Sequence, residues 1–323
     1  MASVTLDIVV ICLDERRHLP RCLRAINGAN HAGLSVQVLV VDGGSTDRSR
    51  ELARELGARV IDSPRGIPRQ RNAGGRAATA QLLAYVDADV ALTSQWFATV
   101  ARRFADERRQ LLGSTPQLPA AASWIARAYW LHWARPSGAT QRIARQLSTQ
   151  SLVMGREVFT EVDGFDERLR VDEDTDFVFR ARARGVPVIS DPALRYVHHG
   201  EPRDLRAFAR RIAWGVNAER WLQALREADL PRVWRPQYLF GALVGAELGA
   251  VAASVAGGPL LGWPLGLPLA GGALAATIGL PALITAHRER AYGQLPALCA
   301  MFGVYGAATA AGLVRGRGPA RWR

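Results

Sequence analysis

The chain of 323 residues carries a formal net charge of +12 at pH 7 and three cysteines. Every one of its 41 basic residues is arginine, a bias typical of a GC-rich coding sequence, so the charge alone does not indicate an anionic partner. No basic run is interleaved with stacking aromatics, which argues against nucleic-acid binding. The odd cysteine count without metal-type spacing fits a reducing, cytosolic compartment. The length suffices for one α/β domain and a substantial appendage.

The first 90 residues alternate short β-branched apolar runs with segments of helical periodicity, the pattern of a parallel sheet built from βαβ units. Asp7 interrupts the first apolar run, which therefore indicates a strand rather than a signal peptide. Ser45, Thr46 and Asp47 are N-cap candidates for the helix after the second strand, and Gly57 would end that helix. Strands are expected at residues 7–13, 36–41, 59–61 and 82–86.

Aromatic side chains crowd a short segment within residues 91–147 that also carries Arg127 and Arg135. We expect an amphipathic helix that either packs on the core or lies at a bilayer interface, where Trp and Tyr are favoured. Residues 148–190 then return to a strand, helix, strand pattern rich in acids. The aromatic residues concerned are Trp124, Tyr129, Trp130 and Trp133.

Three long apolar stretches occupy residues 238–257, 260–286 and 295–314, and Glu247 is their only acid. Lengths near twenty residues suit membrane-spanning helices, and helices in lipid tolerate the many Gly and Pro residues found here. A buried, soluble helical core is the alternative.

Basic residues flank these stretches and bear on their topology. The residues before the first stretch and after the second fit a hairpin with both ends inside. If the third stretch also crossed the membrane, the basic residues after it would lie outside, against the positive-inside tendency. A re-entrant or interfacial third stretch would avoid this, so the topology stays open. The flanking residues are, in order, Arg232 and Arg235; His287, Arg288 and Arg290; and Arg315, Arg317, Arg321 and Arg323.

Asp87 and Asp89 follow the fourth expected strand, at the sheet edge where parallel strands bind ligands. Paired carboxylates suit a hard divalent cation that also meets diphosphate oxygens. Asp42 ends the second strand, where its carboxylate could accept from a base N–H or simply hold a turn. Arg71 could meet diphosphate oxygens or remain a solvated charge. It belongs to a polar cluster with Arg65, Arg69 and Asn72.

Four carboxylates stand within residues 172–176, at the expected start of a helix. The helix dipole favours acids there, but four exceed what a cap needs, so one could take a proton from a hydroxyl. His198 and His199 follow a short strand, and either could be a metal ligand or a structural histidine.

Taken in order, these motifs resemble those of the family 2 glycosyltransferases of the GT-A fold. The resemblance covers about residues 5–220 and rests on VVDGGSTD, RQRNAG, the acid pair DAD, GREVFTEVDGFDERL, EDTD and HHG. It implies an α/β GT-A domain with a central, mostly parallel sheet in residues 1–230, with a donor half to about residue 90 and an acceptor half after it. A C-terminal region with two or three transmembrane or re-entrant helices would follow in residues 231–323.

The resemblance further implies an inverting transfer of a sugar from a nucleotide-sugar donor. Asp174 would be the general base and Asp42 would lie near the nucleotide base. Arg71 and Glu15 would also bind the donor, although residues 12–15 read CLDE where the family often has PxYNE. Residues 210–214 lack the QxxRW pattern of processive members, so polymerisation is not expected.

The resemblance also implies a divalent metal, Mg²⁺ or Mn²⁺. Asp87 and Asp89 would serve the metal and the ribose, and His198 would close the metal site, although His199 is adjacent. Residues supporting the acceptor side would be Glu173, Asp176 and Gly155.

The acceptor would be a hydroxyl or phosphate, and the apolar tail suggests a lipid-linked one in cell-envelope or exopolysaccharide synthesis. The enzyme would then sit at the inner membrane with its catalytic domain facing the cytoplasm. One alternative is a GT-A-like nucleotidyltransferase, although the glycine-rich loop usual for that class does not follow Ile11. The other is an inactive membrane scaffold of the same fold, which would need neither acid cluster.

Overall fold

The computed structural model describes residues 3–133, 142–144, 147–169, 172–215, 236–261 and 266–315. The chain divides into two compact units, the first comprising Met1–Ala120 with Arg135–Gly200 and the second Ala121–Ala134 with Glu201–Arg323. The expected domain boundary near residue 230 lies outside the described residues. So do Arg135 of the aromatic segment and several of the flanking arginines, namely Arg232, Arg235, Arg317, Arg321 and Arg323.

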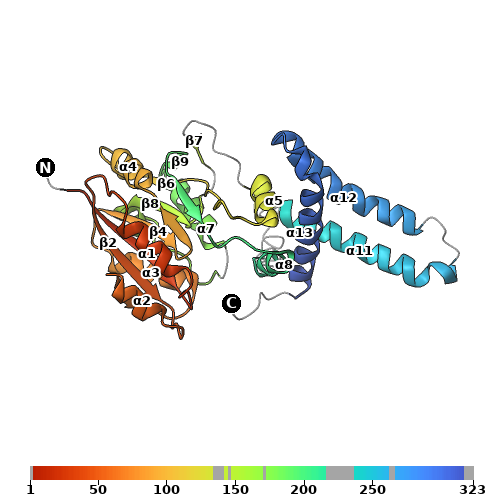
Figure 1. The fold of residues 1–323 in the computed structure, drawn as a ribbon, viewed down its shortest axis with the longest axis horizontal. Coiled ribbons are helices and arrows are strands. Elements are labelled where there is room, and N and C mark those ends of the chain that lie inside the picture. The colour runs from red at the N-terminus through yellow and green to blue at the C-terminus, as the bar shows by residue number, and fades with distance from the viewer. Residues whose placement is uncertain are drawn as a thin grey trace. The chain divides into compact units, whose positions relative to one another are not determined.

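The first unit is built on an eight-stranded sheet in the order β3-β2-β1-β4-β8-β6-β9-β7 (Figure 1). The first four positions of that order are parallel strands, whereas β8 runs antiparallel to both β4 and β6. The parallel strands are β1 (Thr5–Cys12), β2 (Ser35–Asp42), β3 (Arg59–Asp62) and β4 (Leu82–Asp87). All four expected strands are thus confirmed, with ends that move by one or two residues.

The remaining strands are short and extend the sheet beyond β4. They are β6 (Leu111–Gly113), β7 (Arg142–Ile143), β8 (Ser151–Gly155) and β9 (Val188–Ser190). A separate antiparallel pair joins β5 (Val90–Leu92) to β10 (Tyr196–His198). Because β5 follows directly on the acid pair, this pairing brings the HHG segment to the acid pair.

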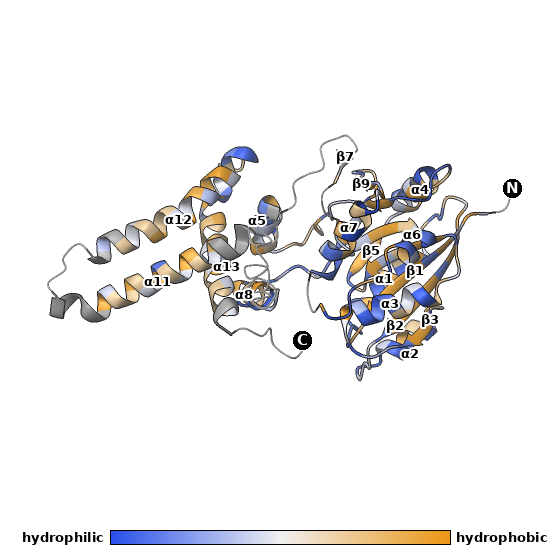
Figure 2. Ribbon diagram, turned by 180° about the vertical axis from the view of Figure 1, so that it is seen from behind, coloured by the Kyte–Doolittle hydropathy of each residue, from blue (hydrophilic) through white to orange (hydrophobic). Residues whose placement is uncertain are grey.

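Helices cover both faces of the sheet, and successive residues of β1 point to opposite faces. Ile8 and Val10 pack in the cluster that contains α1 and α4, whereas Val9 packs in the cluster that contains α6 and α7. Figure 2 shows that the strands between these layers are predominantly hydrophobic. The helices are α1 (Leu19–Asn27), α2 (Ser49–Glu55), α3 (Ile67–Ala77), α4 (Ser94–Arg103), α6 (Arg156–Glu161) and α7 (Glu173–Ala183).

The expected cap of α2 is wrong by a few residues. The helix begins at Ser49, and its N-cap residue is Arg48, whose φ is 69°. The side chain of Ser45 instead accepts from the backbone N–H of Asp14 (2.9 Å), and that of Asp47 accepts from the N–H of Arg16 (3.0 Å). The polar residues therefore hold a neighbouring loop rather than extend the helix.

The second unit is helical. Its cluster of buried residues joins α5, α8, α12 and α13, and the expected aromatic helix is confirmed as α5. Two stretches, Ala270–Arg288 and Tyr292–Gly312, are long and apolar enough to cross a membrane. The helices are α5 (Trp124–Trp133), α8 (Leu205–Trp214), α11 (Pro236–Leu261), α12 (Gly266–Arg288) and α13 (Leu295–Arg315), with a 3₁₀ turn, η1 (Tyr292–Gln294), before the last.

Candidate active site

The carboxylate of Asp42, the last residue of β2, is buried and organises the turn that follows. It accepts from the backbone N–H groups of Gly44 and Ser45, both at 3.0 Å, and the Arg50 guanidinium lies 3.5 Å away. In this structure Asp42 therefore holds the turn after β2, which is one of the two roles that the sequence allowed for it. Its position at the carboxyl end of a parallel strand is also the ligand-binding edge of the sheet.

The loop after β1 is fastened to the loop after β2. Besides the bonds from Ser45 and Asp47, the Ser49 hydroxyl accepts from the N–H of Glu15 (2.9 Å), and Asp14 accepts from the N–H of Thr46 (2.8 Å). Burial, followed by the charges of Asp89 and Asp87, raises the pKa of Glu15 to about 7. Glu15 is thus held close to the acid pair.

Helix α3 contributes two buried amides that the sequence analysis did not single out as site residues. The Gln70 side chain donates to the carbonyls of Cys12 (2.9 Å) and Val41 (3.0 Å), and so joins the ends of β1 and β2. The Asn72 amide donates to the carbonyl of Phe165 (2.8 Å) and its oxygen accepts from the same residue's N–H (2.8 Å). Both amides lie in the RQRNAG motif, which was the available signal.

Arg71, on the same helix, is buried and joins two carboxylates from distant segments. Its guanidinium forms an ion pair with Glu173 at the start of α7 and another with Asp87 at the end of β4, the latter at 3.2 Å. It also lies over the ring of Phe165, 5.7 Å from the centroid. The interpretation of Arg71 as a solvated surface charge is therefore wrong.

Asp174 follows Glu173 in the first turn of α7. Burial, followed by the Glu173 charge, raises the pKa of Asp174 to about 7, against the opposing influence of Arg71. A carboxylate with a pKa near neutrality can both accept and release a proton at physiological pH. Asp172 precedes the helix with a φ of 65° and makes no side-chain cap, whereas the other three acids lie in the first turn, where the helix dipole favours them.

Asp89 meets the histidine of β10. Its Oδ1 lies 3.2 Å from Nε2 of His198, and its carbonyl accepts from the N–H of His199 (2.8 Å). A Cβ added to Gly200 would lie 1.7 Å from Oδ2 of Asp89, so only glycine allows this approach. The ring of His198 is thus in direct contact with the acid pair.

The structure brings seven of the ten predicted site residues into one connected region, and Asp176, Gly155 and Asp42 lie outside it. Asp176 pairs with Arg180 (2.8 Å) within α7, away from Arg71. Gly155 ends β8, where a Cβ would meet the Arg108 carbonyl at 2.5 Å. Asp42 lies at the end of β2, which is separated from β4 by β1. The connected residues are Glu15, Arg71, Asp87, Asp89, Glu173, Asp174 and His198.

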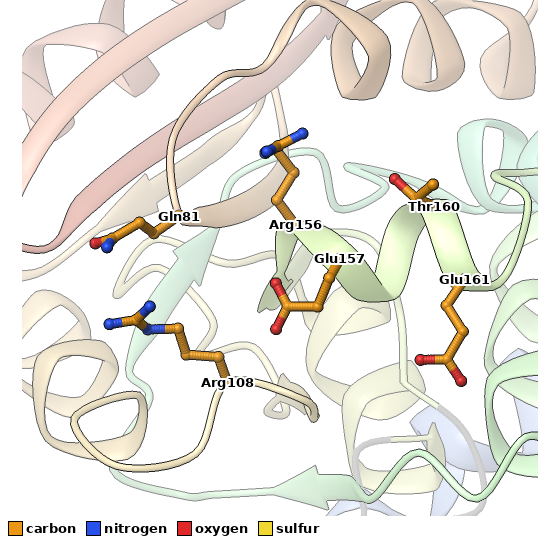
Figure 3. Close-up of a pocket in the computed structure, with 6 residues that line it drawn as sticks. All are labelled: Gln81, Arg108, Arg156, Glu157, Thr160 and Glu161. Atoms are coloured by element: carbon orange, nitrogen blue, oxygen red, sulfur yellow. The ribbon is translucent and has the colours of Figure 1, made fainter.

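A hollow of about 500 Å³ lies elsewhere in the first unit (Figure 3). Gln81 immediately precedes β4 and Arg156 follows β8, so the hollow is at the opposite end of β4 from Asp87. Its other lining residues are Arg108, Glu157, Thr160 and Glu161. It contains none of the predicted site residues.

A divalent cation fits the chemistry of the donor set around the acid pair, which offers carboxylate oxygens and one imidazole nitrogen. Within the described ranges, however, no three His, Cys, Asp or Glu side chains are already gathered as a metal cluster. Asp89 and His198 are in contact, and burial is the main cause that raises the pKa of Asp87, with the charge of Asp89 adding to it. Such mutual repulsion is what a bound cation relieves.

Comparison with known proteins agrees with this arrangement. The family model of glycosyl transferase family 2 matches residues 7–156, which include Asp42, Arg71 and the acid pair. The matched segment is 150 of the chain's 323 residues, and over it the chain is similar to glycosyl transferase family 2.

Curated relatives match over a shorter stretch. An uncharacterized glycosyltransferase of Mycobacterium tuberculosis is 39% identical over 90 residues, which are 28% of this chain and 38% of the relative. Glycosyltransferase AglE of Haloferax volcanii is 27% identical over 97 residues, or 28% of this chain and 32% of the relative. The matched segment thus spans about a third of the length of these relatives.

Solved structures identify the fold as GT-A. The mannosyltransferase PcManGT of Pyrobaculum calidifontis, in complex with GDP-Man and Mn²⁺, has a TM-score of 0.61 at 19% identity, covering 96% of this chain and 86% of that one. GalNAc-T7 with UDP, GalNAc and Mn²⁺ has a TM-score of 0.51 at 16% identity, covering 69% and 51%. The expected fold class is therefore confirmed.

Proposed function

We propose that the protein is an inverting glycosyltransferase that moves a sugar from a nucleotide-sugar donor to a hydroxyl or phosphate acceptor. The observation that carries this proposal is the bridge made by Arg71. One guanidinium holds Asp87, on the strand edge where a donor would bind, and Glu173, the neighbour of the proposed base Asp174. The match to the family model over residues 7–156 and the activities of similar proteins support it.

In the proposed reaction, Asp174 accepts the proton of the acceptor hydroxyl as its oxygen attacks the anomeric carbon. The bond between that carbon and the diphosphate oxygen breaks, and the nucleotide diphosphate leaves. Arg71 is placed to stabilise negative charge that develops on the leaving diphosphate. Asp42 and Glu15 would bind the nucleotide portion at the ends of β1 and β2.

We propose that Asp89, with Asp87 and His198, holds a divalent metal, Mg²⁺ or Mn²⁺. When bound, the cation would neutralise diphosphate charge and so make the nucleotide a better leaving group. Two solved structures of similar fold contain Mn²⁺, which supports the choice of ion for testing.

We further propose that the second unit associates with the inner membrane and that the catalytic unit faces the cytoplasm. The acceptor would be lipid-linked, and the reaction would belong to cell-envelope or exopolysaccharide synthesis. The two apolar stretches of α12 and α13 support the association. Mass spectrometry of products from membranes given a panel of nucleotide-sugars would identify donor and acceptor. A product found only on water-soluble acceptors would refute the lipid-linked acceptor.

Two conservative substitutions test the assigned roles. Asp174→Asn should keep metal-dependent donor binding in calorimetry and lose at least about 10²-fold in transfer rate, because only the base is removed. Asp89→Asn should instead weaken metal-dependent nucleotide binding. Asp176→Asn is the matched control, since that carboxylate pairs with Arg180 on the same helix. Full transfer by the Asp174 variant, or unchanged binding by the Asp89 variant, contradicts the respective role.

A further inference from the structure

The hairpin formed by α11 and α12 exposes large apolar side chains along its length. Val255 and Leu280 are each 61% exposed, and Ile284 is 56% exposed. The helices have 26 and 23 residues, hence lengths of about 39 and 35 Å, which exceed the roughly 30 Å of a bilayer's hydrocarbon core. Water is an unfavourable environment for such a surface, and lipid is a favourable one.

Helix α13 is equally apolar but does not run beside that hairpin. Suppose that α13 ran back along the hairpin from the end of α12. Thr309, which lies about 21 Å from the first residue of α13, would then reach the middle of α11. Thr309 instead packs on Gly241, only about 8 Å from the start of α11, where a Cβ would come within 2.4 Å of its side chain. Phe302, two turns earlier, meets the adjacent Phe240, with ring centroids 5.9 Å apart.

The other half of α13 stays at the same end of the hairpin. Leu298 and Met301 share a buried cluster with Ala282 and Ala286, which lie in the last two turns of α12. Both halves of α13 therefore touch the base of the hairpin, where α11 begins and α12 ends. Figure 1 shows α13 lying across that base rather than along the two helices.

The outer side of α13 is covered by helices that carry charge. Phe208 of α8 and Ile125 of α5 belong to its buried cluster, and the Phe302 ring lies 4.7 Å from that of His132. Arg127 of α5 and Arg210 of α8 are exposed. Such residues are costly in hydrocarbon but favourable among headgroups. Accordingly, 39% of the apolar stretch of α13 is buried inside the protein, against 17% of that of α12.

We propose that α11 and α12 alone cross the bilayer, while α5, α8 and α13 lie together at the membrane surface on the side where the hairpin begins. The inference rests on the membrane association proposed above. It keeps the basic residues at and just after the end of α12 and the arginine that ends α13 on one side, as the positive-inside tendency requires. These residues are His287, Arg288, Arg290 and Arg315.

Cysteine labelling of the full chain tests this arrangement. Single cysteines replace Gly266 at the start of α12, Gly293 in η1 and Arg315 at the end of α13, in a background where Cys12, Cys22 and Cys299 are alanine. Gly293 suits substitution because a Cβ there meets no atom within 4 Å. A membrane-impermeant maleimide is applied to sealed vesicles of each orientation, and variants are used only if they retain glycosyl transfer.

The expected result is that Gly293→Cys and Arg315→Cys are labelled in the same vesicle orientation and Gly266→Cys in the opposite one. Labelling of Arg315→Cys together with Gly266→Cys would mean that α13 crosses, which overturns the inference while leaving membrane association intact. Labelling of all three from one side would show that the hairpin does not cross. If the full chain did not sediment with vesicles at all, the membrane association itself would fail.

Discussion

The carboxylate of Glu173 forms an ion pair with Arg71 and raises the pKa of Asp174, and replacement of Glu173 by glutamine tests both effects. The ion pair with Arg71 would become a neutral hydrogen bond, while Arg71 would keep its partner Asp87 at 3.2 Å. Loss of a buried pair costs about 3–5 kcal/mol when a charge is left without any partner, so the retained partner predicts a smaller loss of about 1–3 kcal/mol. The variant should therefore fold.

The informative consequence concerns the pKa of Asp174. Glu173 is one of the charges that raise this pKa to about 7, and Arg71 lowers it. Removing the Glu173 charge leaves Arg71 to favour the Asp174 carboxylate, and a nearby charge typically shifts a pKa by about one unit or more. A general base works when deprotonated, so the acid limb of the pH profile should move to lower pH.

The magnitude follows from the protonation equilibrium. With a pKa of about 7, the ratio of rates at pH 6 and pH 8 is about 0.1, whereas a pKa of about 6 gives about 0.5. The assay is the pH dependence of kcat/KM, with Glu173→Asp expected to restore the original profile in part. Asp176→Asn is the control, because its carboxylate pairs with Arg180 and should not shift the acid limb. An unchanged or raised pKa in Glu173→Gln would refute the reasoning.

Two further substitutions probe other parts of the first unit. Gly200→Ala should weaken metal-dependent nucleotide binding by about tenfold or more, because the added Cβ would collide with Asp89. The matched control is Gly293→Ala, where the added Cβ meets no atom within 4 Å. Equal nucleotide binding by the two variants would contradict the prediction. Asp7 is buried and accepts from the N–H groups of Thr79 (2.6 Å) and Ala80 (2.9 Å). Asp7→Asn should thus lower the free energy of unfolding by about 1–3 kcal/mol without changing transfer per folded molecule, and an altered kcat would argue otherwise.

Local patterns in the sequence suffice for the parts of this fold that depend on neighbouring residues. The four parallel strands follow from β-branched runs, and the carboxylates at their ends follow from the rule that ligands bind at that edge. The short strands β6 and β9, each of three residues, offer too few side chains for periodicity to detect.

Contacts between segments that are distant in the sequence could not be predicted from such local patterns. Arg71 and Glu173 are 102 residues apart in the chain, so their ion pair could not be predicted from the sequence. The sequence analysis considered only diphosphate oxygens or solvent as the surroundings of the Arg71 guanidinium. Gly200 looks unremarkable until β10 pairs with β5 and brings it against Asp89. The third apolar stretch satisfied the length and composition of a crossing helix, and only its contacts with the start of α11 suggest another orientation.

The bonds that fasten the loop after β1 to the loop after β2 have a consequence for the thermodynamics of donor binding. Asp14, Glu15 and Arg16 each donate a backbone N–H to a side chain of the second loop, so both segments are ordered before any nucleotide arrives. Chain ordering opposes binding when it happens on association, and here that entropy is already lost during folding. These amides should accordingly exchange slowly with deuterium in the free protein, and nucleotide should protect them little further.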